Sequence, residues 1–289
     1  MPGAGPLRAL VLNAMILLEY PPKSINRYDT CCRSTLVLLN TKTNDLKLAF
    51  ETCGSRHCPH CELRYRRAVA LRISDAIGHV KPRIWRFITL TLTHSDLSLS
   101  DQLDHLQASF RRLRMSALWQ STQLKGFGII EVTWSASTSR WHPHLHILTR
   151  GLFIPQRRLS QQWIKASSGS EVVDIRKIST SAKAISYVTK YLGKAPDLLS
   201  AESPGRLMVE YLAALRHRKL LISFGTQVVP EHDPPGDPTP LVVAPWIILT
   251  TLATLLKARA RGDVSASIML DRLLHGGKAP RHSTFIRDG

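Results

Sequence analysis

The sequence has no apolar run long enough to span a membrane. The longest, residues 241–256, contains Pro245 and is shorter than the roughly 20 residues that a spanning helix needs. We therefore predict a buried helix there, or a helix packed on a partner, and no stable membrane insertion. A second apolar run, residues 7–18, is followed by Glu-Tyr-Pro-Pro instead of a small-residue cleavage site, which argues against a secretory signal.

Acidic residues are scarce relative to basic ones. The chain has 39 Lys and Arg against 21 Asp and Glu, which gives a formal charge of +18 and a pI near 10.2. Basic side chains displace condensed counterions from phosphates, so an excess of this size points to a nucleic-acid partner.

Cysteine is also scarce, with five in 289 residues, and the cysteines are clustered. This is too few for a secreted disulfide scaffold, so we expect a reducing, cytoplasmic location and metal binding. Tetrahedral Zn²⁺ takes four ligands, of which Cys53, Cys58 and Cys61 supply three. An intervening hairpin could bring Cys31 or Cys32 close enough to be the fourth, and His57 and His60 compete for that position.

The periodicity of the chain predicts an α+β fold. Predicted strands at 35–39 and 46–52 form a hairpin, followed by a helix at 62–79, a strand at 85–93 and a helix at 103–119. Strands at 128–134 and 141–149, a helix at 156–165, a strand at 171–175 and a helix at 182–192 complete the series. This order suits an antiparallel sheet with helices packed on it. The five prolines within residues 229–240 suggest a linker.

Residues 141–148 read Trp-His-Pro-His-Leu-His-Ile-Leu. Side chains two apart on a strand point to the same side, so His144 and His146 present their imidazoles to one point, while Leu145 and Ile147 face the other way. Imidazole pairs at this spacing suit Mn²⁺, Zn²⁺ or another divalent ion.

The third ligand depends on the register of the hairpin. With a turn centred at residues 137–138, Glu131 lies across from His144 on the same face, and Thr133 opposes His142. Glu131 and His142 are both candidates for the third ligand.

Residues 187–194 read Tyr-Val-Thr-Lys-Tyr-Leu-Gly-Lys. Residues four apart are neighbours on a helix, so Tyr187 and Tyr191 present two phenols side by side, with Lys190 and Lys194 on an adjacent stripe. A phenol has a pKa near 10 and needs help to act as a nucleophile, which a nearby metal and a lysine can supply.

Together these segments resemble the HUH endonucleases, and more narrowly the rolling-circle replication initiators of plasmids and phages. Three motifs occur in the family's order: the alternating hydrophobe-threonine strand at residues 87–93, the histidine strand and the paired-tyrosine helix. The resemblance covers about residues 50–195.

The resemblance implies a palm-like sheet with the histidine strand in its middle, and Mg²⁺ or Mn²⁺ held by His144, His146 and a third polar ligand. It also implies that Tyr191 attacks single-stranded DNA at an origin to give a 5′-phosphotyrosine and a 3′-OH that primes a host polymerase. Tyr187 would carry out the second transesterification, and Lys190 would offset phosphate charge.

The cysteine segment resembles the zinc module that precedes the nuclease core in many plasmid replication proteins. A basic helix follows it, and this helix together with Lys194 is expected to grip phosphate. The DNA-binding candidates are Arg64, Arg66, Arg67 and Lys194. We thus expect a zinc-ribbon-like N-terminal region (1–80), a nuclease domain (81–196) and a C-terminal region of unassigned role (197–289).

Two alternatives stay open at this point. A two-tyrosine rolling-circle transposase would use the same chemistry. A zinc-dependent DNA-binding regulator would use the histidines and tyrosines structurally. The sequence has no GxxxxGK[ST] motif, so unwinding would require a host helicase.

Overall fold

The computed structural model describes the chain apart from residues 1–3, 78–84, 192–195, 226–244 and 276–289. By its contacts the chain divides into two units. The first combines residues 1–20 with 56–233, and the second combines residues 21–55 with 234–289. Neither unit is continuous in sequence. The predicted proline-rich linker, residues 229–240, falls outside the described residues.

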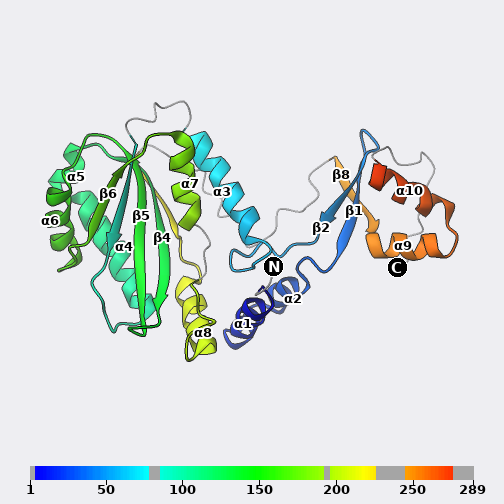
Figure 1. The fold of residues 1–289 in the computed structure, drawn as a ribbon, viewed down its shortest axis with the longest axis horizontal. Coiled ribbons are helices and arrows are strands. Elements are labelled where there is room, and N and C mark those ends of the chain that lie inside the picture. Colours follow the sequence, from blue (N-terminus) through cyan, green and yellow to red (C-terminus); the bar gives the residue numbers. More distant parts are fainter. Residues whose placement is uncertain (1–3, 78–84, 192–195, 226–244, 276–289) are drawn as a thin grey trace. The chain divides into compact units, whose positions relative to one another are not determined.

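The first unit is built on a five-stranded antiparallel sheet of order β6-β3-β5-β4-β7. Its strands are β3 (Trp85–Thr91), β4 (Lys125–Ser135), β5 (Arg140–Arg150), β6 (Val173–Lys177) and β7 (Leu221–Phe224). The histidine strand β5 occupies the centre (Figure 1). The predicted α+β class is confirmed, with the histidine strand in the middle of an antiparallel sheet.

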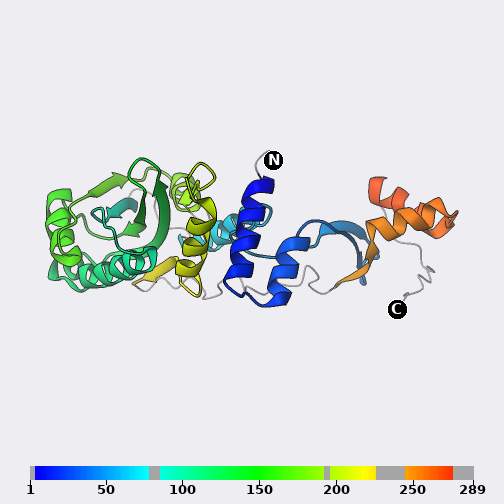
Figure 2. The same cartoon turned by 90° about the horizontal axis from the view of Figure 1, so that it is seen from below.

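Helices cover both faces of this sheet. The helices of this unit are α1 (Ala4–Leu17), which packs on α8, and α3 (Glu62–Ile77), α4 (Leu99–Met115), α5 (Ala117–Ser121), α6 (Gln156–Ser167), α7 (Ser181–Tyr191) and α8 (Pro204–Leu215), and Figure 2 gives a second view of them. Phe110 of α4 approaches Gly128 and Leu145 on one face. On the other face α7 and α3 share an apolar cluster with Phe87 and Phe127 of the sheet. The tyrosine helix α7 and α4 therefore lie on opposite faces.

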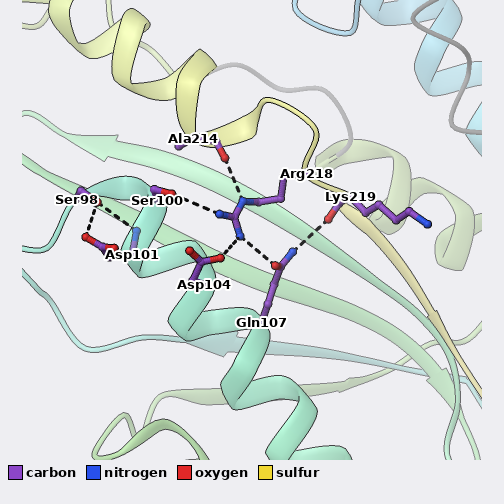
Figure 3. A network of polar contacts seen from close by, with 8 residues as sticks. All are labelled: Ser98, Ser100, Asp101, Asp104, Gln107, Ala214, Arg218 and Lys219. Carbon is purple, nitrogen blue, oxygen red and sulfur yellow. Dashed lines mark hydrogen bonds and ion pairs between the residues drawn. The ribbon is translucent and has the colours of Figure 1, made fainter.

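An arginine connects the end of α8 to α4 (Figure 3). Arg218 donates from Nη1 to Asp104 Oδ1 at 2.7 Å and to Gln107 Oε1 at 3.0 Å, while its Nε donates to the Ala214 carbonyl at 3.0 Å. Ser98 caps the start of α4 by accepting a hydrogen bond from the amide of Asp101. Caps of this kind satisfy helix amides that would otherwise have no partner.

Gly126 of β4 packs directly against the backbone of β5. A Cβ added there would come within 2.0 Å of the Leu148 carbonyl oxygen and 2.8 Å of Thr149 Cα. Because both atoms belong to the backbone, the strands themselves would have to move. We expect Gly126→Ala to lower the free energy of unfolding by about 1–3 kcal/mol in urea denaturation. Gly205→Ala, whose added Cβ would meet nothing within 4 Å, is the control. Equal stability of the two variants would contradict the prediction.

The second unit contains a three-stranded antiparallel sheet of order β2-β1-β8. Its elements are α2 (Pro22–Thr30), β1 (Thr35–Asn40), β2 (Leu46–Phe50), β8 (Trp246–Thr251), α9 (Leu252–Ala260) and α10 (Val264–His275). Figure 1 shows the blue β1 beside the orange β8, although they are far apart in sequence. Val37 packs with Leu255, Met269 and Leu270 in the core of this unit.

The prediction of a helix through residues 241–256 was wrong for its middle part. Trp246–Thr251 is a strand paired with β1, and the helix begins only at Leu252, where Thr251 caps it by accepting from the amide of Thr254. An apolar run is compatible with either a buried helix or a strand, and here pairing with a distant strand decides. No helix among the described residues is long and apolar enough to cross a membrane.

Candidate active site on the central sheet

Three histidines of β5 point to the sheet face on which α7 lies. The register of β4 and β5 pairs Glu131 with His144 and Thr133 with His142, which confirms the predicted hairpin. Because directly paired residues of antiparallel strands share a face, the Glu131 carboxylate emerges beside the imidazoles. The sheet thus brings imidazole and carboxylate side chains, both of which can bind metal ions, onto one surface.

The inner part of this surface is shielded from solvent. His146 and Glu131 are only 6% and 7% exposed, and Nε2 of His146 lies 2.9 Å from Oε2 of Glu131. Nδ1 of His146 lies 3.1 Å from Oγ1 of Thr89, and Nδ1 of His144 lies 3.1 Å from Oγ1 of Thr91. Each imidazole is therefore held on its Nδ1 side by a threonine of β3.

The environment of His144 disfavours its charged form. Burial lowers the pKa of His144 to about 4, and the neighbouring His146 and His142 act in the same direction, whereas Glu131 opposes them. The imidazole is consequently neutral at pH 7. Neutral imidazole is the form that can donate a lone pair to a metal ion.

His142 lies at the more open end of the row. Its ring meets that of His94 edge to face at 4.3 Å between centroids. Burial lowers its pKa, with smaller contributions from His94 and Arg140. Of the two candidates for the third ligand, Glu131 is the one whose carboxylate contacts Nε2 of His146, so we favour Glu131 over His142.

The two tyrosines of α7 differ in what their rings contact. The ring of Tyr191 stacks on His146 with centroids 3.7 Å apart and planes 17° from parallel. Both tyrosines stack on Phe87, Tyr187 at 5.0 Å and Tyr191 at 5.8 Å between ring centroids, so the contact with His146 is what distinguishes Tyr191. The pKa of Arg176 on β6 is raised by its hydrogen bond and ion pair with Asp174, and to a lesser degree by a hydrogen bond with Tyr187.

Lys190 is exposed, and its Nζ lies 5.3 Å from the centre of the Tyr191 ring. A cation at this distance contributes a favourable electrostatic interaction with the ring. The predicted partner Lys194 falls in residues 192–195, outside the described part of the chain.

The donors on this face suit a divalent cation. They combine neutral imidazole nitrogen with carboxylate oxygen, a set that Mn²⁺ and similar ions accept. Their ligand atoms are not all gathered within 4.8 Å of one another. Among the residues that the structure describes, the potential ligand atoms that lie within 4.8 Å of one another in a group of three or more are the sulfur atoms of the cysteine cluster. The assignment of His144, His146 and Glu131 as ligands thus remains a prediction.

The cysteine cluster consists of Cys31, Cys53, Cys58 and Cys61. All four are buried, and their sulfur atoms lie within 4.8 Å of one another. Four thiolates gathered in this way could hold a structural metal ion such as Zn²⁺ and fit a zinc-ribbon-like module. The fourth position belongs to Cys31. Cys32, His57 and His60 are not in the group, although the sequence left them open as alternatives.

The predicted phosphate-binding arginines lie on α3, the helix that packs beside α7. Arg64 and Arg67 are exposed, whereas Arg66 forms an ion pair with Glu62 one turn earlier on the helix. Two of the three predicted phosphate-binding arginines are thus exposed to solvent. The third is already engaged with a carboxylate.

Sequence reasoning did not assign a role to several residues that the structure places at the site. Thr89 and Thr91 were noticed only as part of an alternating motif, and the strand pairing shows what they touch. Phe87 was likewise noticed only as the first residue of that motif, and Arg176 carries no sequence signal of its own. Phe87 pairs with Arg176 across β3 and β6, so the sheet brings both to the tyrosine helix.

Comparison with known families supports this description. The family model described as Replication protein matches residues 46–234, more than half of the chain. Neither the curated proteins nor the solved structures contain a match to the sequence. The matched range includes the histidine strand, the tyrosine helix and three of the four clustered cysteines. On the extent of this match, the chain belongs to the replication protein family.

Proposed function

We propose that this protein initiates rolling-circle replication by nicking and rejoining single-stranded DNA through a phosphotyrosine intermediate. The observation that carries the proposal is the stacking of Tyr191 on His146, because it puts a phenol at the edge of a buried histidine and carboxylate surface. The net charge of +18 provides the attraction for a DNA strand.

In the proposed first step the phenol oxygen of Tyr191 attacks the phosphorus of the scissile phosphodiester. A P–Oη bond forms and the P–O3′ bond breaks, the phenol gives up its proton to solvent, and the departing 3′ oxygen takes up a proton, which leaves a 5′-phosphotyrosine and a 3′-OH. A divalent cation, when held by His144, His146 and Glu131, would supply charge stabilisation at the phosphate oxygens. Stacking on His146 restricts the orientation of the Tyr191 ring before the attack.

The joining step uses the same chemistry in reverse. A 3′-OH attacks the phosphotyrosine, the new phosphodiester forms, and the phenol leaves. Tyr187 offers a second nucleophile one helical turn away, and the exposed Lys190 offsets phosphate charge. We further propose that the free 3′-OH serves a host polymerase in the cytoplasm, with strand separation supplied by a host helicase.

The test uses single-stranded oligonucleotides from the DNA element that encodes the protein, labelled at either end. After incubation with Mn²⁺ or EDTA, samples are run on denaturing protein gels. A 5′-phosphotyrosine retains the downstream fragment, so a 3′ label should stay on the protein and a 5′ label should be released as a free oligonucleotide. The adduct should require Mn²⁺ and disappear in His144→Ala.

The outcomes separate the candidate functions. Retention of the 5′ label instead of the 3′ label would contradict the proposed polarity. Tight DNA binding without any adduct would contradict nicking and would favour the alternative function, a zinc-dependent DNA-binding regulator. A rolling-circle transposase would give the same adduct, and the DNA sequence that is cut would identify it.

A further inference from the structure

The alternating threonines of β3 contact the histidines of β5 one to one. Thr89 pairs with His146 and Thr91 with His144 in the strand register, and each hydroxyl lies 3.1 Å from the Nδ1 atom of its partner. Both contacts use the same atom of the threonine and the same ring nitrogen. A repeated pair of this kind reflects the two-residue period of paired strands.

We propose that Thr89 and Thr91 are positioning residues that orient the Nε2 atoms of His146 and His144 toward the cation of the proposed nuclease site. The inference rests on that proposed function and adds a role for the threonine strand. With Nδ1 held by the β3 hydroxyl, Nε2 is the nitrogen that can turn to the ion, and the imidazole ring loses rotational freedom. Nε2 of His144 has only a longer contact, 3.4 Å to Oγ1 of Thr133, which an ion could displace.

A hydroxyl suits this task better than a carboxylate. It can accept a hydrogen bond from an Nδ1–H group, and it can also donate one to a bare Nδ1. In the structure His146 Nε2 faces the Glu131 carboxylate at 2.9 Å, an arrangement in which Nε2 carries the proton and Thr89 donates to Nδ1. When Nε2 binds a cation, the proton must lie on Nδ1, and the same hydroxyl then accepts. Threonine thus supports both tautomers.

The rest of β3 holds these hydroxyls in place. Ile88 and Leu90, which alternate with the threonines, are 2% and 0% exposed and anchor the strand in the opposite core. A shift of β3 by one residue would turn the threonines into the opposite core and Ile88 and Leu90 toward the histidines, so the register is strongly specified. The hydroxyls therefore have a defined position relative to β5.

The test measures Mn²⁺ affinity of the full chain by electron paramagnetic resonance of free Mn²⁺, without DNA. His144→Ala gives the background from other sites, which is subtracted. Thr89→Val and Thr91→Val keep the shape of the side chain and remove the hydroxyl. We expect each to weaken Mn²⁺ binding by about 10-fold and the double variant by more, as for other residues that orient metal ligands. Thr89→Ser and Thr91→Ser should restore most of the affinity.

Thr149→Val is the matched control. Its hydroxyl is buried on the same sheet but donates to the Lys125 carbonyl, not to a histidine. It should lower stability without changing Mn²⁺ affinity. If both Thr→Val variants keep the wild-type affinity for the Mn²⁺ ion that is lost in His144→Ala, the positioning role is overturned and the proposed function stands. Wild-type protein that binds no more Mn²⁺ than His144→Ala would overturn both.

Discussion

Replacing Tyr191 by phenylalanine is expected to slow the first strand cleavage by on the order of 10³-fold or more, because it removes the nucleophile itself. Tyr187→Phe should leave the first cleavage within a few-fold of wild type and impair strand transfer to a second site. The asymmetry follows from the structure, since both rings stack on Phe87 but the Tyr191 ring also stacks on His146 at 3.7 Å. Single-turnover cleavage of a 3′-labelled oligonucleotide measures the rate, and the double variant should form no adduct.

Phenylalanine keeps the ring in both variants, so the stacking on His146 or Phe87 is preserved and thermal unfolding should change little. The two substitutions therefore act as controls for each other. The order of action would be reversed if Tyr187→Phe abolished cleavage while Tyr191→Phe retained it. Full activity of the double variant would exclude tyrosine chemistry altogether.

If the four-cysteine cluster holds zinc, replacing Cys58 by serine is expected to abolish zinc binding there and to lower the melting temperature by many degrees. Metal binding to structural zinc sites is worth about 10–16 kcal/mol in small zinc-finger peptides, and serine replaces the thiolate with a poor zinc ligand. Cys58 is fully buried, with its sulfur among those of Cys31, Cys53 and Cys61. Elemental mass spectrometry measures the zinc content of each variant, and thermal unfolding measures its melting temperature.

Cys32→Ser is the matched control for this prediction. Cys32 adjoins Cys31 in the chain but is not in the four-cysteine cluster, so its variant should keep one zinc ion per chain. Loss of zinc in Cys32→Ser with retention in Cys58→Ser would show that the ligand set is different. Treatment of the wild type with a strong zinc chelator should reproduce the effect of Cys58→Ser.

Local patterns were sufficient to predict the components of the candidate site. The two-residue period of a strand placed His144 and His146 on one face, and the short turn at residues 137–138 determined that Glu131 would lie opposite His144. The helical period likewise placed Tyr187 and Tyr191 together. Each of these relations joins residues close in sequence, where backbone geometry leaves few choices.

Contacts between distant segments could not be predicted in the same way. The apolar run at residues 246–251 became a strand because β1, some two hundred residues earlier, offers it hydrogen bonds. The same pairing gives the second unit its interleaved composition of residues 21–55 and 234–289. Local sequence patterns could not predict this pairing, because they carry no information about which distant segments meet.

By itself, the amino-acid sequence determined the chemical groups of this protein: the histidine strand, the paired tyrosines, the clustered thiols and the basic charge. Tertiary structure decided which of these groups meet. It selected Cys31 over its neighbour Cys32, stacked Tyr191 rather than Tyr187 on His146, and set Thr89 and Thr91 against the imidazoles. The physical reason is that side-chain type and local period are properties of short segments, whereas these contacts depend on how separate strands and helices pair and pack.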